Sequence, residues 1–211
     1  MDKQRLFILL SLGLACALPR TLLADERAID LWNRISVLYT QDEDWLKKNT
    51  AAGLGTKKPL DFNPFQRSPY FDELTKKEDL LEQLATDGDT TAQYYEGVLN
   101  LRVGDRANGP EATEAQRWSA RMDYQRAIRW LRPLADAGNP NAQRTLAEVN
   151  FDGKGISKSS SNAIDWYFKA EEGFRKAGDR KQAVTTLDKM REIDPSGPLT
   201  KRASEALFFS Q

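Results

Sequence analysis

The sequence contains no histidine, and its one cysteine, Cys16, lies close to the start of the 211-residue chain. Without histidine the chain cannot form a Ser-His-Asp or Cys-His nucleophile system, nor a histidine-ligated zinc or iron site. The 31 basic residues are balanced by 31 acidic ones, whereas nucleic-acid-binding proteins carry a clear basic excess to neutralise phosphates. Much enzymology is thereby excluded, and a nucleic-acid partner is not expected. Taken with the features below, we expect a protein that is not an enzyme, with no catalytic residue, metal, cofactor or small-molecule substrate.

The first 24 residues differ in composition from the rest of the chain. The segment "MDKQR" carries two positive charges, and "LFILLSLGLACAL" then gives 13 mostly apolar residues with no charge. This pattern is typical of a secretory signal peptide ending at a small residue, and it is shorter than the ~20 residues that span a membrane. We expect residues 1–24 to be a signal peptide, with cleavage between Ala24 and Asp25 and a periplasmic mature chain.

Cys16 leaves a second interpretation open, because bacterial lipoproteins are cut just before a cysteine that is then lipidated. Here Gly13 stands where the usual signal has leucine, and apolar sequence continues beyond the cysteine. We favour removal of Cys16 with the signal peptide, which leaves a mature chain without disulfides. The alternative is an outer-membrane lipoprotein. Mass spectrometry of the mature N-terminus separates the two: a chain that starts at Asp25, or an acylated Cys16.

Helical periodicity dominates from residue 25 onward. Apolar residues at three- and four-residue steps form an amphipathic stripe, which consists of Ala28, Leu31, Trp32, Ile35, Leu38 and Tyr39. Residues 51–72 interrupt the pattern with glycines and three prolines, and it returns from Leu74 to Leu84. No segment alternates apolar and polar residues as a strand does. The predicted fold class is all-α.

Three segments that begin at residues 85, 135 and 175 repeat one another. Each has a glycine suited to end a helix in the left-handed conformation, followed by an Asp or Asn that can cap the next helix. The pairs are Gly88–Asp89, Gly138–Asn139 and Gly178–Asp179. Residues 127–130 and 163–166 also share the sequence Ala-Ile-x-Trp. We expect alternating helices whose stacked pairs build a continuous core.

Residues 141–173 resemble a Sel1-like repeat, whose pattern is A-x-x-x-L-G-x-x-Y/F-x-x-G-x-G, a loop, then x-x-A-x-x-W-Y-x-x-A-A-x-x-G. With Ala147 in place of a glycine, the matches are Ala142, Leu146, Phe151, Gly153, Gly155, Ala163, Trp166, Tyr167, Ala170 and Gly173. Residues 85–101 are a poorer copy, with Glu96 at a leucine position and a loop lengthened by about 20 residues around "RVGDRANGPEATEAQRWSARM". Residues 167–195 drift towards the related tetratricopeptide pattern.

The resemblance covers roughly residues 80–195 and implies a short right-handed α-solenoid of antiparallel helix pairs. It also implies a protein–protein adaptor of the cell envelope of a Gram-negative bacterium, of the kind used in secretion, polysaccharide export or flagellar-motor assembly. In such proteins the first helix of each pair lines a groove that binds the partner. The residues expected to face outward there are Gln93, Tyr94, Asn100, Gln143, Arg144 and Glu148.

The remaining segments are assigned by their position relative to the repeats. Residues 25–79 form an N-terminal helix and a Pro- and aromatic-rich extended segment, and 196–211 a C-terminal capping helix or tail. In the extended segment Phe62, Phe65 and Tyr70 either pack on the helical scaffold or offer a surface for a partner, because aromatics are enriched in interfaces. Both interpretations stay open.

The segment "FDGKGISKSSSNAIDWY" (151–167) has the composition of a phosphate-binding loop but lacks Gly-Lys-Ser/Thr after a strand. The repeat explains its glycines as turn residues and Ser161 or a neighbouring serine as an N-cap. We expect Trp130 and Trp166 in the core, and leave Trp118 open as part of a loop or of a short helix that packs it inward. Acidic pairs such as Glu171–Glu172 are expected on solvated faces.

Two alternatives to a soluble adaptor remain. One is a membrane-anchored lipoprotein scaffold, which depends on Cys16. The other is a regulator or subunit of an envelope enzyme, which predicts a deep pocket with clustered acidic residues of raised pKa.

Overall fold

The computed structural model describes residues 20–54 and 68–209, and the side chains of residues 27–48 and 68–209. All regular secondary structure in these ranges is helical, which confirms the predicted all-α class. The helices are α2 (Arg20–Leu54), α3 (Phe71–Thr86), α4 (Thr90–Ala107), α5 (Glu114–Asp136), α6 (Pro140–Asp152), α7 (Ser160–Lys176), α8 (Arg180–Ile193) and α9 (Pro198–Phe209). Most of the predicted signal peptide, and both Phe62 and Phe65, lie outside the described residues.

The chain divides into two compact units, Met1–Ala92 and Gln93–Gln211. The repeat pattern predicts a boundary near residue 80 instead. The structural boundary lies later in the sequence because α3 packs against α2 and so belongs with the N-terminal unit.

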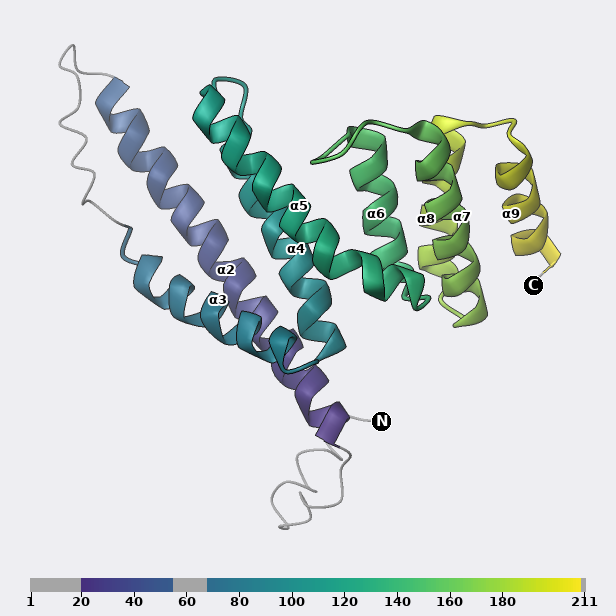
Figure 1. The fold of residues 1–211 in the computed structure, drawn as a ribbon, viewed down its shortest axis with the longest axis horizontal. Coiled ribbons are helices and arrows are strands. Elements are labelled where there is room, and N and C mark those ends of the chain that lie inside the picture. Colours follow the sequence, from purple (N-terminus) through teal and green to yellow (C-terminus); the bar gives the residue numbers. More distant parts are fainter. Residues whose placement is uncertain (1–19, 55–67, 210–211) are drawn as a thin grey trace. The chain divides into compact units, whose positions relative to one another are not determined.

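In the first unit, α2 and α3 pack against each other (Figure 1), and most of the predicted apolar stripe of α2 is buried. Its buried members are Ala28, Leu31, Ile35, Leu38 and Tyr39, whereas Trp32 is half-buried. The Tyr39 hydroxyl donates a hydrogen bond of 2.7 Å to Glu78 Oε1 on α3. The helices also extend further than expected, because α2 continues to Leu54 and α3 starts at Phe71. The expected cleavage position after Ala24 falls within the first turns of α2.

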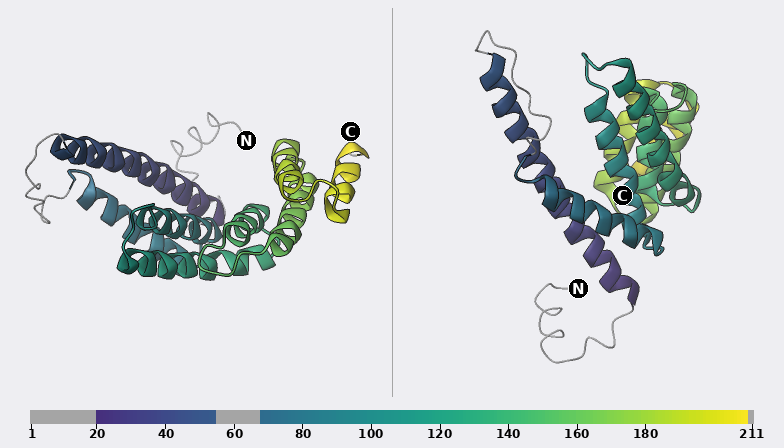
Figure 2. Two further views of the ribbon diagram at one scale, coloured as in Figure 1. Left: turned by 90° about the horizontal axis from the view of Figure 1, so that it is seen from above. Right: turned by 60° about the vertical axis from the view of Figure 1, so that its left-hand side comes forward.

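The second unit stacks its helices in the order of the chain. Helix α5 packs on α6, α6 on α7, α7 on both α8 and α9, and α8 on α9; the same succession is seen in both Figure 1 and Figure 2. One continuous core runs through these helices, and its members include Leu131, Leu146, Trp166, Leu187 and Met190. Burial of apolar area of this kind is the main stabilising contribution to such a unit.

The turns between helices follow the sequence prediction. Gly88, Gly138 and Gly178 have φ of 97°, 94° and 76°, the left-handed region that glycine adopts without a steric penalty. The next residue caps the following helix in each case, with Asp89 accepting from Ala92 N (2.8 Å), Asn139 from Ala142 N (3.0 Å) and Asp179 from Gln182 N (3.1 Å). Ser159, a neighbour of Ser161, caps α7 by accepting from Asn162 N.

The long loop expected before residue 122 is mostly helix. Helix α4 continues to Ala107, and α5 begins at Glu114 behind a capping box formed by Thr113 and Gln116. Gly104, which suggests a loop in the sequence, allows close packing instead: a Cβ there would lie 2.5 Å from Tyr124 Cε1. Trp118 is 65% exposed on α5, so it does not pack inward.

The two tryptophans of the Ala-Ile-x-Trp motif differ in burial. Trp166 is 8% exposed and belongs to the core, as predicted, with the Arg132 guanidinium 5.2 Å and the Lys169 ammonium 4.2 Å from its ring centre. Trp130 is only half-buried.

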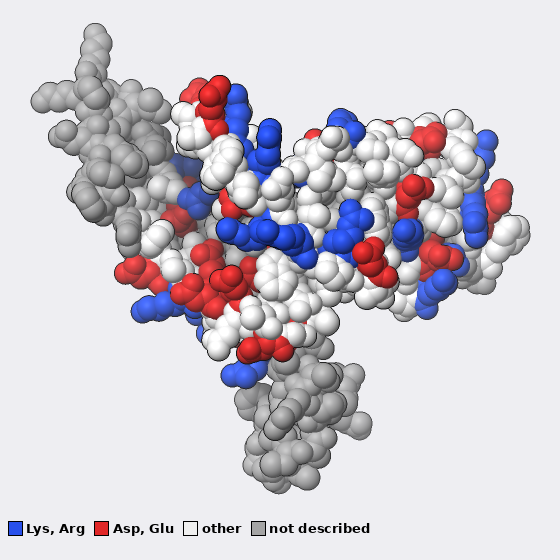
Figure 3. Space-filling view, in the orientation of Figure 1, with Lys and Arg blue, Asp and Glu red and all other residues white. Residues whose placement is uncertain are grey.

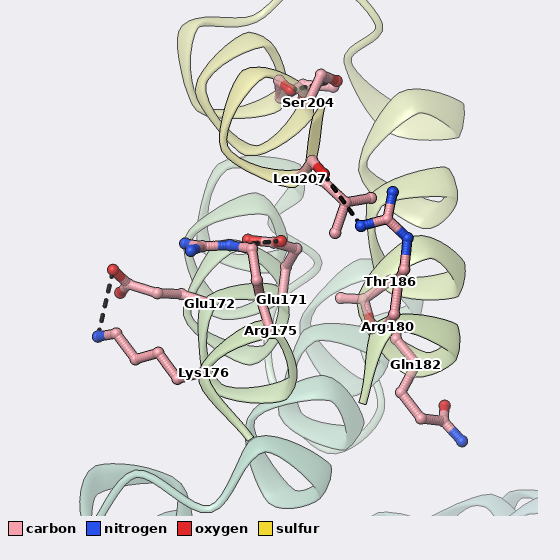
Figure 4. Close-up of polar contacts among 10 residues, drawn as sticks. Glu171, Glu172, Arg175, Lys176, Arg180, Gln182, Thr186, Ser204 and Leu207 are labelled. Atoms are coloured by element: carbon pink, nitrogen blue, oxygen red, sulfur yellow. Dashed lines mark hydrogen bonds and ion pairs between the residues drawn. The ribbon is translucent and has the colours of Figure 1, made fainter. Parts of the chain in front are cut away.

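Glu171 is fully buried on α7, which contradicts the expectation of a solvated acidic pair. Its Oε1 accepts from Arg175 Nε at 3.2 Å, while Oε2 has no hydrogen-bond partner (Figure 4). Glu172, one residue on, points to the surface and pairs with Lys176 at 3.3 Å (Figure 4). Helical geometry explains the difference, because adjacent residues lie about 100° apart and only one of them faces the neighbouring helices.

Burial raises the pKa of Glu171 above its ordinary value, although the Arg175 charge acts in the opposite direction. A carboxyl with a raised folded-state pKa binds its proton more tightly in the native protein, so its ionisation opposes folding above that pKa. We expect the free energy of unfolding of the wild type, measured relative to Glu171→Gln, to rise as the pH falls from 7 towards 4.5. Urea denaturation at several pH values measures this gap. Glu172→Gln is the matched control. If the free energy of unfolding of the wild type minus that of Glu171→Gln stays constant or falls on acidification, the assignment is contradicted.

The described helices include none long and apolar enough to cross a membrane. On the face of the C-terminal helices shown in Figure 3, basic and acidic side chains lie next to one another without a large field of one sign, in keeping with the equal totals.

Candidate functional site

A hollow of about 300 Å³ opens between α6, α7 and α8, with one residue of α4 at its edge. We call it the α6–α8 hollow. It is lined by Leu101 from α4, Glu148, Val149, Phe151 and Asp152 from α6, Lys154 from the following turn, Tyr167 from α7, and Lys189, Glu192 and Ile193 from α8. If the helices are paired as the repeat resemblance implies, α4, α6 and α8 are the first members of successive pairs, and this is the face on which that resemblance predicts binding.

The local sequence places these side chains together through helical spacing. Residues four apart lie on one face of a helix, and this brings Glu148 and Asp152 of α6 to the same side. Lys189 and Glu192 of α8, three apart, do the same on the other wall. Gly153 ends α6 with a φ of 77°, so the chain turns there and Lys154 lies beside the hollow rather than on a further helical turn.

Most charges around the hollow are already paired. Lys154 Nζ lies 2.9 Å from Asp105 Oδ2 and 3.6 Å from Asp152 Oδ2, and Lys189 Nζ lies 2.8 Å from Glu192 Oε2. Asp105 also accepts a hydrogen bond of 2.8 Å from the Tyr124 hydroxyl on α5. Lys154, which the repeat pattern leaves unconstrained, therefore ties the turn after α6 to α4.

Glu148 is the exception among these carboxylates. Across the described part of the chain no basic group lies within 4.0 Å of it. Desolvation by the surrounding helices raises its pKa, while the nearby charges of Arg144, Lys154 and Lys189 act in the opposite direction. The residue as a whole is nevertheless exposed to solvent. Glu148 is thus a partly desolvated carboxylate without an ion-pair partner.

Tyr167 forms part of the base of the hollow. The residue is 2% exposed, yet its hydroxyl makes no hydrogen bond to any residue that the structure describes, although it lines the hollow. Burial raises the pKa of this phenol, and the negative charges of Glu148, Asp152 and Glu192 raise it further. The hydroxyl oxygen itself keeps some solvent-accessible surface, so it is open to a ligand or to water, and it can both donate and accept a hydrogen bond.

Arg144 lies on α6 one turn before Glu148. Its guanidinium contacts Gln182 Oε1 of α8 and lies 5.3 Å from the ring centre of Phe174 on α7. Arg144 therefore helps to hold α6, α7 and α8 together next to the hollow, and it is only half-buried.

Two residues expected on the outer face are buried instead. Asn100 is 8% exposed, and its Nδ2 donates to Glu96 O at 2.8 Å and to Glu96 Oε2 at 3.2 Å. Gln143 is 7% exposed, and its Nε2 donates 2.9 Å to Ala135 O, which joins α6 to the end of α5. Both amides satisfy backbone or side-chain groups inside the fold and so are not available on the surface.

The other predicted residues are dispersed. Gln93 and Tyr94 are half-buried at the start of α4, where the Tyr94 ring packs against the core and lies 5.4 Å from that of Tyr95. Tyr70 is the residue before α3 and is half-buried, without a side-chain capping bond. Of the predicted set, Glu148 is the one that lines the hollow.

The sequence interpretation missed Tyr167, Lys154, Lys189 and Glu192 as parts of one site. Tyr167 matches the repeat signature, which indicates a core position and gives no reason to expect its hydroxyl at a binding site. The four-residue spacing of Glu148 and Asp152 was a usable signal for one wall. The contribution of α8 depends on how α6 and α8 pack, which periodicity alone does not give.

A larger hollow of about 420 Å³ lies between α2 and α3 in the first unit. Its side chains include Asp30 and Arg34, which are largely exposed and pair with each other at 3.0 Å. The α6–α8 hollow is the better candidate because it contains Glu148, a residue of the predicted binding set, together with Tyr167.

Among the described residues no group of acidic or cysteine side chains is arranged to hold a metal ion. No family model, curated protein or solved structure matches the chain.

Proposed function

We propose that this chain is a protein–protein interaction adaptor, in which paired helices form a short right-handed α-solenoid and a partner segment binds on the face of α4, α6 and α8. The observation that carries the proposal is the α6–α8 hollow, where Tyr167 and Glu148 leave polar groups without partners on that face. The repeated glycine turns and caps support the repeat architecture. The helices around the hollow are held by core packing, so binding needs little rearrangement.

We further propose that the adaptor works in the bacterial envelope, as a periplasmic protein after removal of residues 1–24. The composition of this segment supports export. Secretion, polysaccharide export and flagellar-motor assembly are the settings that the repeat resemblance suggests, and lipidation of Cys16 would place the same adaptor on the outer membrane.

Site-specific photo-crosslinking in intact cells tests the proposal. A photoreactive residue is placed at position 189, which lines the hollow, or at the matched exposed lysine position 169 of α7, which does not. We expect a discrete, stoichiometric protein adduct from position 189 and at least a fivefold weaker one from 169, because a bound segment contacts only the first position. Equal labelling from both positions, or no adduct from 189, contradicts the proposal.

A further inference from the structure

The α6–α8 hollow is lined by more negative than positive side chains, and this imbalance indicates which kind of ligand it can bind. Three carboxylates line it (Glu148, Asp152 and Glu192) against two ammonium groups (Lys154 and Lys189), which leaves one negative charge in excess. Both lysines are paired with acids other than Glu148. The unmatched negative charge is therefore Glu148, which is exposed to solvent at the edge of the hollow.

The second feature is Tyr167, a residue that is more than nine-tenths buried and lines the hollow, and whose hydroxyl has no partner in the described part of the chain. A phenol can accept a hydrogen bond as well as donate one. Glu148 and Tyr167 thus offer a carboxylate oxygen from α6 and a hydroxyl oxygen from α7 to the same occupant. The walls between them include apolar side chains, among them Leu101, Val149 and Ile193.

We propose that the hollow binds a lysine side chain presented by a segment of the partner protein, with the ammonium donating to Glu148 and to Tyr167 Oη. The lysine stem is an apolar chain that packs along apolar surface while its charged end reaches a polar site. The ammonium is a compact charge with three donors, which suits two acceptors on different helices. A guanidinium pairs best with one carboxylate through two parallel hydrogen bonds. That arrangement would use Glu148 alone, whereas the compact ammonium is the better fit to two acceptors on different helices.

This inference rests on the proposed adaptor function and specifies its partner. The probe is the peptide Ac-Ala-Ala-Lys-Ala-Ala-NH2, titrated into the full mature chain while backbone amide chemical shifts are followed by NMR. The matched peptides carry norleucine, which keeps the stem and removes the charge, or arginine. We expect the lysine peptide to shift amides around residues 148, 167 and 192, and to bind at least tenfold tighter than the norleucine peptide and tighter than the arginine peptide.

Three variants distinguish the effect of each proposed acceptor from the effect of the overall charge of the protein. Glu148→Gln and Tyr167→Phe keep side-chain size and remove one acceptor each. Because hydrogen bonds to charged groups are among the stronger ones in proteins, each is expected to weaken lysine-peptide binding about tenfold. Glu172→Gln removes the same charge from the surface pair with Lys176 and is expected to change binding by less than twofold.

Several results would overturn the inference. These are equal affinity for the norleucine peptide, tighter binding of the arginine peptide, no binding of the lysine peptide at millimolar concentration, or an effect of Glu172→Gln as large as that of Glu148→Gln. Crosslinking from position 189 that persists undiminished in Glu148→Gln would also overturn it, while leaving the adaptor function intact. If no adduct forms from position 189 in the otherwise unchanged chain, the result counts against the adaptor function itself.

Discussion

Replacement of Leu146 by alanine is expected to lower the free energy of unfolding of the second unit by about 3–5 kcal/mol. Leu146 is 1% exposed in the core that α5, α6, α7, α8 and α9 share. Truncation removes buried apolar atoms and leaves a cavity that closely packed helices cannot fully close. Since whole domains are stable by only about 5–15 kcal/mol, this one change removes a large part of the total.

Urea denaturation followed by far-UV circular dichroism measures the effect, with the C-terminal unit read by the amide exchange of α7. Val184→Ala is the control, because it truncates an aliphatic side chain in the same unit at a position of α8 that is 36% exposed. The control is expected to cost less than about 1 kcal/mol. Similar losses in the two variants would mean that Leu146 is not a core residue.

Replacement of Gly155 by alanine is the second large change, with an expected loss of about 2–5 kcal/mol, the sum of two separate costs. Gly155 has a φ of 71°, where a Cβ costs about 1–2 kcal/mol. That Cβ would also lie 2.7 Å from Tyr124 Cβ and 3.2 Å from Gln125 N. Because the neighbours on α5 include backbone and the first side-chain atom, they cannot move aside, and overpacking adds about 1–3 kcal/mol.

Gly178→Ala separates the two costs. Gly178 has nearly the same conformation, with a φ of 76°, but a Cβ there meets nothing within 4 Å. Only the conformational cost of about 1–2 kcal/mol is expected. Chemical denaturation of both variants gives the packing cost as their difference. Equal losses would show that α5 does not press on the turn after α6.

The features that were predictable from the sequence are those that depend on neighbouring residues in the chain. The glycine turns at 88, 138 and 178 and the Asp or Asn caps after them are local devices, and the structure has all of them. The same holds for the apolar stripe of α2, because a period of 3.6 residues is written in the sequence.

Burial of polar residues was not predictable in this way. Asn100, Gln143 and Glu171 have polar side chains at helical positions, which suggests exposure, yet each is enclosed by its neighbours and bonded inside the fold. The segment around Gly104 was predicted to be part of a lengthened loop. In the structure it is helical, and the glycine allows α4 to approach Tyr124 closely. The outcome in each case is decided by a second helix.

The candidate site shows the same division. Glu148 could be selected because it lies on the first helix of a repeat-like pair. The hollow that Glu148 lines is formed by α6, α7 and α8, so it depends on how these helices pack. The second proposed acceptor, the Tyr167 hydroxyl, belongs to a residue that the repeat signature assigns to the core.

The central claim is that a partner segment binds on the face of α4, α6 and α8. Photo-crosslinking from position 189, with position 169 as its reference, tests this most directly because it reports contact at a chosen place in the native setting. We expect one discrete adduct from position 189, at least fivefold stronger than the adduct from position 169. Equal labelling at both positions, or no adduct at 189, would contradict it.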